Sequence, residues 1–219
     1  LEELQNKNPS FICAFNLKCY GIDAASSGGH RKNLMAAFEY DNINQKRFVS
    51  DSIKEGMILF EDAFGFKSKS IIAPRYVWNS DLEIDFNKVG VKYIQTTFYQ
   101  QEPAKGGFRK KYHYTGQVSD VSNMVYLVRN VFFEPAYTEN VDAVNNAFEK
   151  VKLAFRFNTP AIISMHRINF VGGLNTIARD NNINQMQRLL TKIIKTYPDV
   201  EFLSSDELGD IIKEKYVRN

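Results

Sequence analysis

Short, continuous apolar runs separated by longer stretches of helical periodicity constrain this sequence more than any other feature. The runs lie at residues 10–15, 70–74, 90–96, 126–133, 160–166 and 200–204. Continuous apolar runs are typical of strands that are buried on both faces, as in a parallel sheet. A strand followed by a helix, repeated along the chain, predicts parallel strands joined by crossover helices. We therefore expect an α/β fold.

Helical periodicity and capping residues predict the helices between these runs. Ser80 and Glu83 have the spacing of a capping box. Val144, Phe148 and Val151 recur at helical spacing and predict the buried face of a later helix. Helices are expected over about 46–64, from Asn79 or Ser80, from Thr138 to about Phe155, from Asn181 or Asn182, and after Ser204.

Two architectures satisfy this alternation: an open doubly wound sheet and a closed or nearly closed (β/α) barrel. The glycine fingerprint of a dinucleotide-binding sheet is missing, since the SSGG segment at 26–29 lacks its spacing, and the sequence has no Walker lysine motif. We therefore expect a barrel that residues 1–219 form as a single domain. The segment 97–124 is expected to be a long irregular region, and such regions are usually functional or mobile.

The composition of the 219 residues excludes several classes of protein. Hydrophobic residues make up 44% and charged residues 24%, which fits a globular domain and not a disordered chain. The net charge of +3 is small for a nucleic-acid-binding surface, so we expect no nucleic-acid partner. No apolar run reaches the roughly 18 residues of a membrane-spanning helix, and no membrane span is expected. The given residues do not begin with a signal peptide, which slightly favours a cytoplasmic location.

Parallel α/β folds place their sites at the carboxyl ends of the strands. His166 is the strongest candidate, because a side chain that titrates near neutral pH stands where an apolar strand meets the rim. Arg129 lies inside an apolar run and is expected to be buried with a partner, where it would orient an anionic side chain. The rule selects these residues: Arg75, Tyr76, Trp78, Tyr99, Arg129, Glu134, His166, Arg167 and Asn169, with Asp23 and His30 in the loop after the first run.

Each interpretation has a structural alternative. His166 could be a satisfied structural histidine, and His30 could be a solvated loop residue. Trp78 is the only tryptophan; it could stack on a sugar ring, and it could equally belong to the core. His113 lies in a segment of basic and aromatic residues, which is expected to be a solvated loop or a loop that grips an anionic glycan.

The order of five segments resembles a divergent bacterial branch of the polysaccharide deacetylase family (carbohydrate esterase family four). These segments are KSIIAPRYVWN, GVKYIQT, YLVRNVFFEP, PAIISMHRINFVGG and YPDVEFLSSDELGDII. The resemblance covers roughly residues 1–212. It implies a distorted (β/α) barrel, often of seven strands, and hydrolysis of an N-acetyl or O-acetyl group. The implied substrate is an acetylated carbohydrate, such as a bacterial surface or capsular polysaccharide, and the implied cofactor is a divalent metal, usually zinc.

The family's site residues carry over in part. His166 corresponds to the general acid, and Arg167 stands in place of the Asp that usually follows it. IAPRY (72–76) matches the R-x-P-P-Y segment by its proline. Ile72 stands where the family has its arginine, so either Arg75 substitutes for it or that role is lost. His30 falls in the metal-ligand region, with Asp23 as a tentative oxygen ligand.

Two parts of the family's metal site have no counterpart in these residues. Leu34 stands where the second histidine of the ligand pair is expected. The paired aspartates of the family's first strand are also missing, so we expect an upstream strand and a seven-stranded complete barrel.

These observations leave three functions open. The first is a metal-dependent deacetylase that acts on a glycan, with His166, Arg129 and Glu134 as its catalytic residues. The second is a relative that binds glycans without hydrolysing them. The third is a metal-free hydrolase on the same barrel, in which Glu134 and His166 form an acid–base pair.

Overall fold

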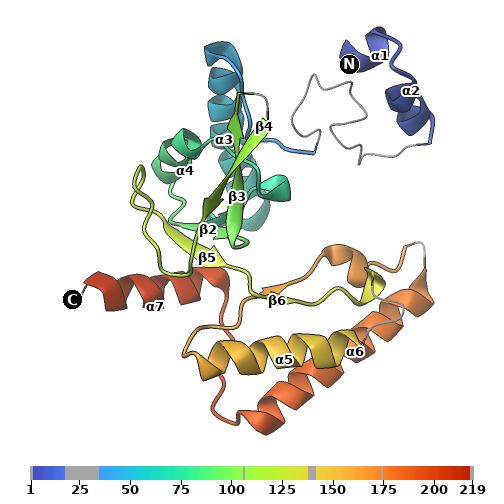
Figure 1. Ribbon diagram of the computed structural model, residues 1–219, viewed down its shortest axis with the longest axis vertical. Helices are drawn as coiled ribbons and strands as arrows, with labels where there is room; N and C mark the ends of the chain where they lie inside the picture. Colours follow the sequence, from blue (N-terminus) through green and yellow to red (C-terminus); the bar gives the residue numbers. More distant parts are fainter. Residues whose placement is uncertain (1, 18–34, 106, 138–141, 174, 218–219) are drawn as a thin grey trace. The chain divides into compact units, whose positions relative to one another are not determined.

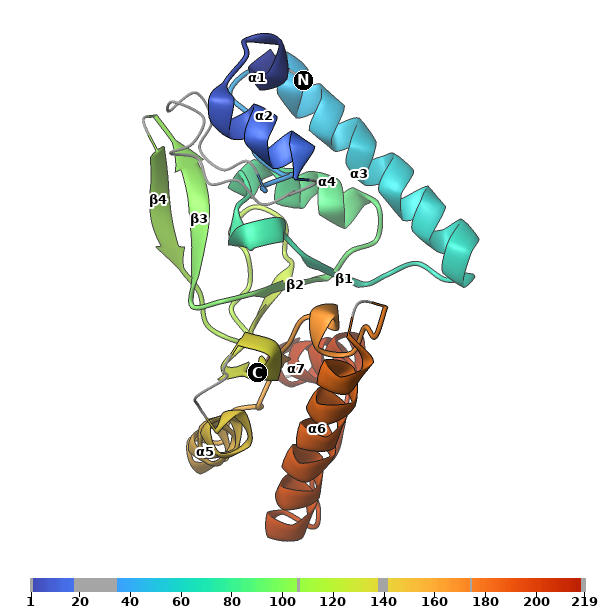
Figure 2. The ribbon, with the colours of Figure 1, turned by 90° about the vertical axis from the view of Figure 1, so that its right-hand side faces the viewer.

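The computed structural model describes residues 2–17, 35–105, 107–137, 142–173 and 175–217 (Figure 1). The chain divides into two compact units: unit 1 comprises Leu1–Leu127 and Ser205–Asn219, and unit 2 comprises Val128–Ser204. Figure 2 shows the same elements from a second direction. Within these ranges, none of the helices is both long enough and apolar enough to cross a membrane.

Unit 1 contains a three-stranded sheet with the strand order β1–β2–β5. These strands are β1 (Ser70–Ile72), β2 (Tyr93–Thr96) and β5 (Val125–Val128). β1 and β2 run parallel, and Ile71 lies opposite Ile94. Both strands fall inside predicted apolar runs, so the strands and their parallel pairing are confirmed.

A long helix, α3 (Ile43–Phe64), precedes β1 and confirms the helix predicted there. It begins at Asn42, whose side chain accepts hydrogen bonds from the backbone of the first turn. It ends at Gly65, which adopts a left-handed conformation (φ 76°) and donates its backbone N–H to Glu61. Val49 and Ile53 are the buried residues of this helix.

The core of unit 1 is apolar and forms one cluster. Short turns and helices carry the chain around it: η2 (Pro74–Tyr76), η3 (Ser80–Leu82) and α4 (Glu83–Lys88). The helix α7 (Ser205–Val217) contacts β2. The buried members of the cluster are Val49, Ile53, Ala73, Trp78, Leu82, Phe86, Val91, Ile94, Met124 and Tyr126.

The capping box expected at Ser80 and Glu83 is wrong. The Asn79 side chain makes no cap hydrogen bond, and η3 begins at Ser80. The Glu83 carboxylate is instead fully buried and accepts a hydrogen bond from the Trp78 indole. A buried carboxylate needs hydrogen-bond donors, and the core supplies more of them than the helix terminus does.

The expectation of an irregular region at 97–124 is also wrong for much of that segment. β3 (Tyr99–Ala104) and β4 (Gly107–Tyr112) form an antiparallel hairpin in which Tyr99 lies opposite Tyr112 (Figure 1). His113 directly follows β4 and is only 4% exposed, so it does not lie in a solvated loop. The strands of this hairpin carry mostly polar side chains, which is why they gave no apolar run.

Unit 2 pairs two short parallel strands with two helices. The strands are β6 (Val131–Phe132) and β7 (Ile163–Ser164), and the helices are α5 (Ala143–Arg156) and α6 (Thr176–Thr196), which contact each other. Val144, Phe148 and Val151 are buried, which confirms the predicted face of α5. Together the buried members of this core are Val131, Phe133, Ala143, Val144, Ala147, Phe148, Val151, Leu189 and Ile193.

Several predicted elements differ from those observed. Residues 10–15 lie in a helix, α2 (Pro9–Asn16), which follows α1 (Glu2–Gln5). The run 200–204 is not a strand, and α6 begins at Thr176, earlier than predicted. A run of five or six apolar residues is too short for its periodicity to distinguish a strand from a helix or an extended loop.

The closed barrel of a single domain stays a prediction. Parallel pairings of the kind that a barrel requires occur between β1 and β2 and between β6 and β7. The first pairing belongs to unit 1 and the second to unit 2.

Candidate functional site

The parallel pair β6–β7 brings Glu134 and His166 together. Val131 lies opposite Ile163, and Phe132 lies opposite Ser164. The pairing continues for one more residue, because the backbone N–H of Phe133 donates to the carbonyl oxygen of Ser164 at 2.9 Å. Glu134 and His166 follow at the same offset, so both side chains stand at the carboxyl edge of the strands, where the sequence placed the site.

Glu134 is a buried carboxylate held by two side chains. Its exposed fraction is 1%. Its Oε1 lies 2.5 Å from Nδ1 of His166, and its Oε2 accepts a hydrogen bond from Nδ2 of Asn169 at 2.6 Å. Burying a carboxylate costs several kcal/mol unless such donors compensate it. The two donors therefore fix where the carboxylate lies and how it is oriented.

His166 presents the other edge of its ring to solvent. Its side chain is 63% exposed, whereas that of Glu134 is fully buried. An ionised carboxylate can only accept, so Nδ1 carries the proton in this contact. In the neutral ring Nε2 then carries the lone pair that can accept a proton. The arrangement of a buried carboxylate and an exposed imidazole is suited to acid–base chemistry.

Asn169 is a positioning residue and does not face solvent. It is fully buried, at the end of the short turn η5 (Arg167–Asn169). Its Nδ2 also donates to the carbonyl oxygen of His166 at 2.8 Å, and its Oδ1 accepts from the backbone N–H of Ala136 at 3.0 Å. Both amide hydrogens and the carbonyl are therefore used within the protein. Contact of Asn169 with a substrate stays a prediction.

Two of the predicted site residues, Arg129 and Arg167, are arginines of unit 2 with different surroundings. Arg129, between β5 and β6, is partly buried and donates from Nη2 to the carbonyl oxygen of Met165 at 3.4 Å. This contact ties Arg129 to the residue that precedes His166. Arg167 is exposed, directly after His166, where its guanidinium can meet a ligand.

The remaining predicted binding residues belong to unit 1. Arg75 and Tyr76 have left-handed backbone conformations (φ 57° and 56°), although neither is glycine. Such residues cost about 1–3 kcal/mol each and cluster at functional sites. Arg75 is exposed and Tyr76 is half-buried.

Trp78 and Tyr99 have different environments. Trp78 is fully buried and donates from its indole to Glu83 at 2.9 Å, so it lies in the core, which is the structural alternative given above. Tyr99 is half-buried in β3, and Nζ of Lys110 lies 4.7 Å from the centre of its ring.

The described residues do not by themselves fit a zinc site. His30 and Asp23, the proposed ligands, lie outside them. In the described part of the chain there is no group of three or more His, Cys, Asp or Glu side chains that could hold a metal ion. In the pair above, Nδ1 of His166 and both oxygens of Glu134 are engaged with protein partners. We therefore derive no step through a metal.

A second buried polar cluster, in unit 1, was missed in the sequence. The Glu83 carboxylate accepts hydrogen bonds from Trp78 Nε1 and Tyr126 Oη, both at 2.9 Å, and from Ser119 Oγ at 2.5 Å. Burial, with Glu83 nearby, raises the pKa of Tyr126. Ser119 and Tyr126 are 36 and 43 residues from Glu83 in the sequence. No local sequence pattern could therefore have revealed the cluster.

His113 lies beside this cluster. Its ring stacks on Tyr126 with a centroid separation of 3.8 Å. Nε2 lies 3.1 Å from Oε1 of Gln100, and Nδ1 lies 3.3 Å from Oε1 of Gln117. Burial lowers the pKa of His113 from its usual 6.5 to about 4. This histidine is a packed core residue and not a group open to substrate.

Comparison of the chain with protein-family models, with curated proteins and with solved structures gives no match.

Proposed function

We propose that unit 2 carries the acid–base centre of a hydrolase that removes acetyl groups from a carbohydrate or polysaccharide. The observation that carries this proposal is the contact between the exposed His166 imidazole and the fully buried Glu134 carboxylate. The resemblance to polysaccharide deacetylases supports the choice of substrate, since His166 stands in the segment that matches the family's general acid.

His166 exchanges the protons of the reaction through Nε2. Hydrolysis adds water to the acetyl carbonyl, breaks the bond to the sugar oxygen or nitrogen, and releases acetate. Neutral Nε2 first takes a proton from the attacking water, and the imidazolium formed in this way then donates that proton to the sugar leaving group. Glu134 holds the ring in place through Nδ1 and stabilises the imidazolium by its negative charge. In the family the residue after this histidine is an Asp, and here the carboxylate comes from the neighbouring strand.

The neighbouring residues have supporting roles in this proposal. Asn169 fixes the carboxylate of Glu134, and Arg129 fixes the backbone before His166. Arg167 is exposed and can bind the glycan or the departing acetate. The resemblance also implies a zinc ion, which would polarise the acetyl carbonyl if it is bound.

The test is release of acetate from a panel of acetylated oligosaccharides, N-acetylated and O-acetylated. We expect His166→Ala to lower turnover by about 10²–10⁴-fold, the usual contribution of acid–base catalysis. Glu134→Gln should also lower turnover, because it removes the carboxylate that holds His166. Its matched control is Glu149→Gln, since Glu149 is an exposed carboxylate of the same unit that pairs with Lys152. Turnover that survives His166→Ala unchanged would remove the acid assignment.

Metal dependence distinguishes the first and third functions. Turnover that is lost with a chelator and restored by zinc supports the metal-dependent deacetylase. Turnover that a chelator leaves unchanged supports a metal-free hydrolase built on Glu134 and His166. Saturable glycan binding without release of acetate would contradict the hydrolase and leave a binding protein.

A further inference from the structure

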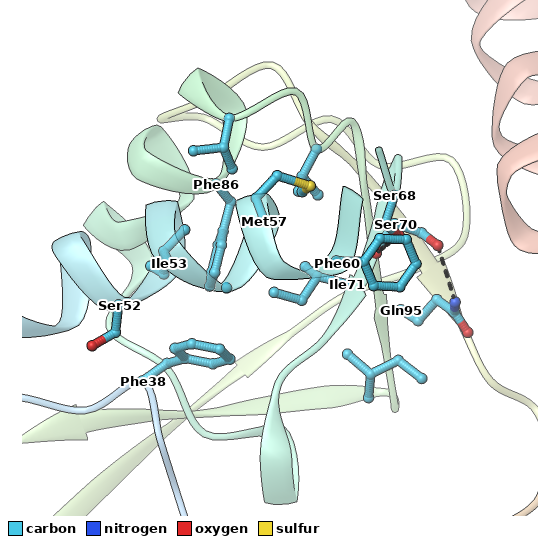
Figure 3. A pocket seen from close by; sticks show the side chains of 14 residues that line it. Phe38, Ser52, Ile53, Met57, Phe60, Ser68, Ser70, Ile71, Phe86 and Gln95 are labelled. Atoms are coloured by element: carbon cyan, nitrogen blue, oxygen red, sulfur yellow. Dashed lines mark hydrogen bonds between the residues drawn. The ribbon is translucent and has the colours of Figure 1, made fainter. Parts of the chain in front are cut away.

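Unit 1 contains a cavity of about 430 Å³ between α3, β1 and the segment that holds α4 (Figure 3). Pockets for small molecules commonly have volumes of about 300–1,000 Å³ and mostly apolar walls. The cavity is partly open to solvent. It lies wholly within unit 1, and it includes none of the residues of the proposed acid–base centre.

The body of the cavity is apolar. Its walls include Phe38, Ile53, Met57, Phe60 and Phe86, and Figure 3 shows these side chains around one space. The rings of Phe38 and Phe86 meet edge to face, with centroids 5.0 Å apart. Such walls favour a hydrocarbon ligand, because burying apolar surface contributes about 25 cal/mol per Å².

Gly56 keeps one side of this cavity open. It lies in the interior of α3 and lines the cavity, and a Cβ atom built on it would meet nothing within 4 Å. A glycine in a helix interior is less favourable than alanine. No neighbouring atom packs closely against Gly56 and so requires a glycine there. The fold should therefore tolerate a side chain at this position, but that side chain would occupy space that a ligand could fill.

One end of the cavity is polar but uncharged. Gln95 and Ser70 line it, and Nε2 of Gln95 lies 3.5 Å from Oγ of Ser70. That contact is long for a hydrogen bond, so the amide keeps capacity for a ligand. Among the described residues that line the cavity, none is charged. A carboxylate ligand would lose its hydration here without gaining a cation, which is costly.

We propose that this cavity binds an uncharged small molecule that is mainly hydrocarbon, with a hydroxyl or carbonyl group that hydrogen-bonds to Gln95. The hydrocarbon part lies among the phenylalanines and Met57. The neutral polar group reaches the end formed by Gln95 and Ser70. This binding does not depend on the acetyl-hydrolase activity proposed above.

The experiment uses the full chain and the neutral fluorophore 1-aminoanthracene. We expect saturable binding of one equivalent, displaced by 1-decanol. Decanoate at neutral pH has the same chain length with a charged end, and we expect it to compete at least about tenfold more weakly. Equal competition by decanoate, or the absence of saturable binding, would overturn the proposal.

Two variants test the location of binding. Gly56→Leu places a side chain in the cavity and is expected to weaken binding more than about tenfold. Its melting temperature should be unchanged or raised, since leucine is the better helix former. The matched control is Glu55→Leu, which adds the same side chain at the neighbouring exposed position outside the lining; it should bind as the wild type does.

A third variant keeps the proposal testable if Gly56→Leu does not fold. Ile72→Trp enlarges a lining side chain that is 42% exposed at the end of β1, and it should also displace the probe. In the wild type, 1-decanol should bind more tightly than decane, because its hydroxyl hydrogen-bonds to Gln95. Gln95→Leu should remove this difference in affinity. Unchanged affinity in folded Gly56→Leu and Ile72→Trp would show that the probe binds elsewhere.

Discussion

The carboxylate of Glu134 and the imidazole of His166 lie in contact although 32 residues separate them in the sequence. The contact follows from the register of two parallel strands, which is a backbone property. Each residue lies just beyond the end of its strand, so no flexible loop has to move to bring the two side chains together. The positions of the pair are therefore fixed by the pairing of the two strands.

Glu134→Gln should disturb the orientation of His166. Glutamine offers a single acceptor oxygen where His166 Nδ1 and Asn169 Nδ2 now donate to two. Either one hydrogen bond is lost, or the imidazole changes tautomer to accept from the new amide. We expect a change in the ¹⁵N shifts of the His166 ring and a loss of about 1–3 kcal/mol in the free energy of unfolding. Unchanged ring shifts would contradict the positioning role.

Glu83→Leu should strongly destabilise the protein. It would leave the Trp78 indole and the Tyr126 hydroxyl buried without their acceptor, at about 1–3 kcal/mol for each group. Urea unfolding followed by fluorescence measures the loss, because Trp78 is the only tryptophan. Ile84→Leu, one residue along and exposed, is the control and should unfold as the wild type does.

His113 should make the protein less stable as the pH falls below 6.5. Its folded-state pKa of about 4 is depressed by burial, and its ordinary value is 6.5. Between these values the unfolded chain binds the proton and the folded chain does not, so protonation favours unfolding. The stability is fully present above pH 6.5, and the loss by pH 4 is at most about 3 kcal/mol.

The control for this pH dependence is His113→Gln, which should flatten the stability profile between pH 6.5 and 4. The charged groups that act on His113 are Lys111, which lowers its pKa, and Glu102 and Asp120, which raise it. If the protein instead became more stable on acidification in this range, the folded state would bind the proton more tightly than the unfolded state. His113 would then be an imidazolium held by the amide oxygens of Gln100 and Gln117.

Gly209→Ala should destabilise the packing of α7 on the sheet of unit 1. A Cβ atom at this position would lie 2.6 Å from three atoms of the Tyr93 ring. The ring is fully buried, and its hydroxyl donates to Asp210 at 2.5 Å, so it has little freedom to move. We expect a loss of about 1–3 kcal/mol by thermal unfolding.

Gly56→Ala is the contrasting control for that prediction. Gly56 is also helical, and a Cβ atom there would meet nothing within 4 Å, so alanine should stabilise by about 1 kcal/mol. Equal effects of the two substitutions would show that contact with Tyr93 does not limit residue 209.

The pattern of apolar residues in the sequence predicted those helices and strands that are determined by their own residues. The strands β1 and β2 and the buried face of α5 are examples, because their apolar residues alone determine them. The rule that sites form at the carboxyl ends of parallel strands also selected Glu134 and His166 before their contact was known. Asn169 was selected with them as a binding residue, and its hydrogen bonds to Glu134 and His166 were not predicted because they depend on the fold.

The failures have two causes, namely weak local signals and contacts between distant segments. The run 10–15 is apolar but too short to distinguish a helix from a strand. The hairpin β3–β4 is largely polar, and its only signal was the glycine pair at 106–107 between two stretches of strand length. The cluster around Glu83 joins residues from distant segments. Its donors became visible only when the folded chain placed them around one carboxylate.

The register of β6 and β7 determines which changes in chain length the site tolerates. Lengthening the connection between α5 and β7 would leave Glu134 and His166 facing each other, because the pairing of the strands does not depend on the length of the chain between them. Deleting a single residue between Phe132 and Glu134 would turn the carboxylate to the opposite face of the strand. Natural or engineered insertions should therefore be tolerated between α5 and β7. They should not be tolerated between β6 and Glu134 or between β7 and His166.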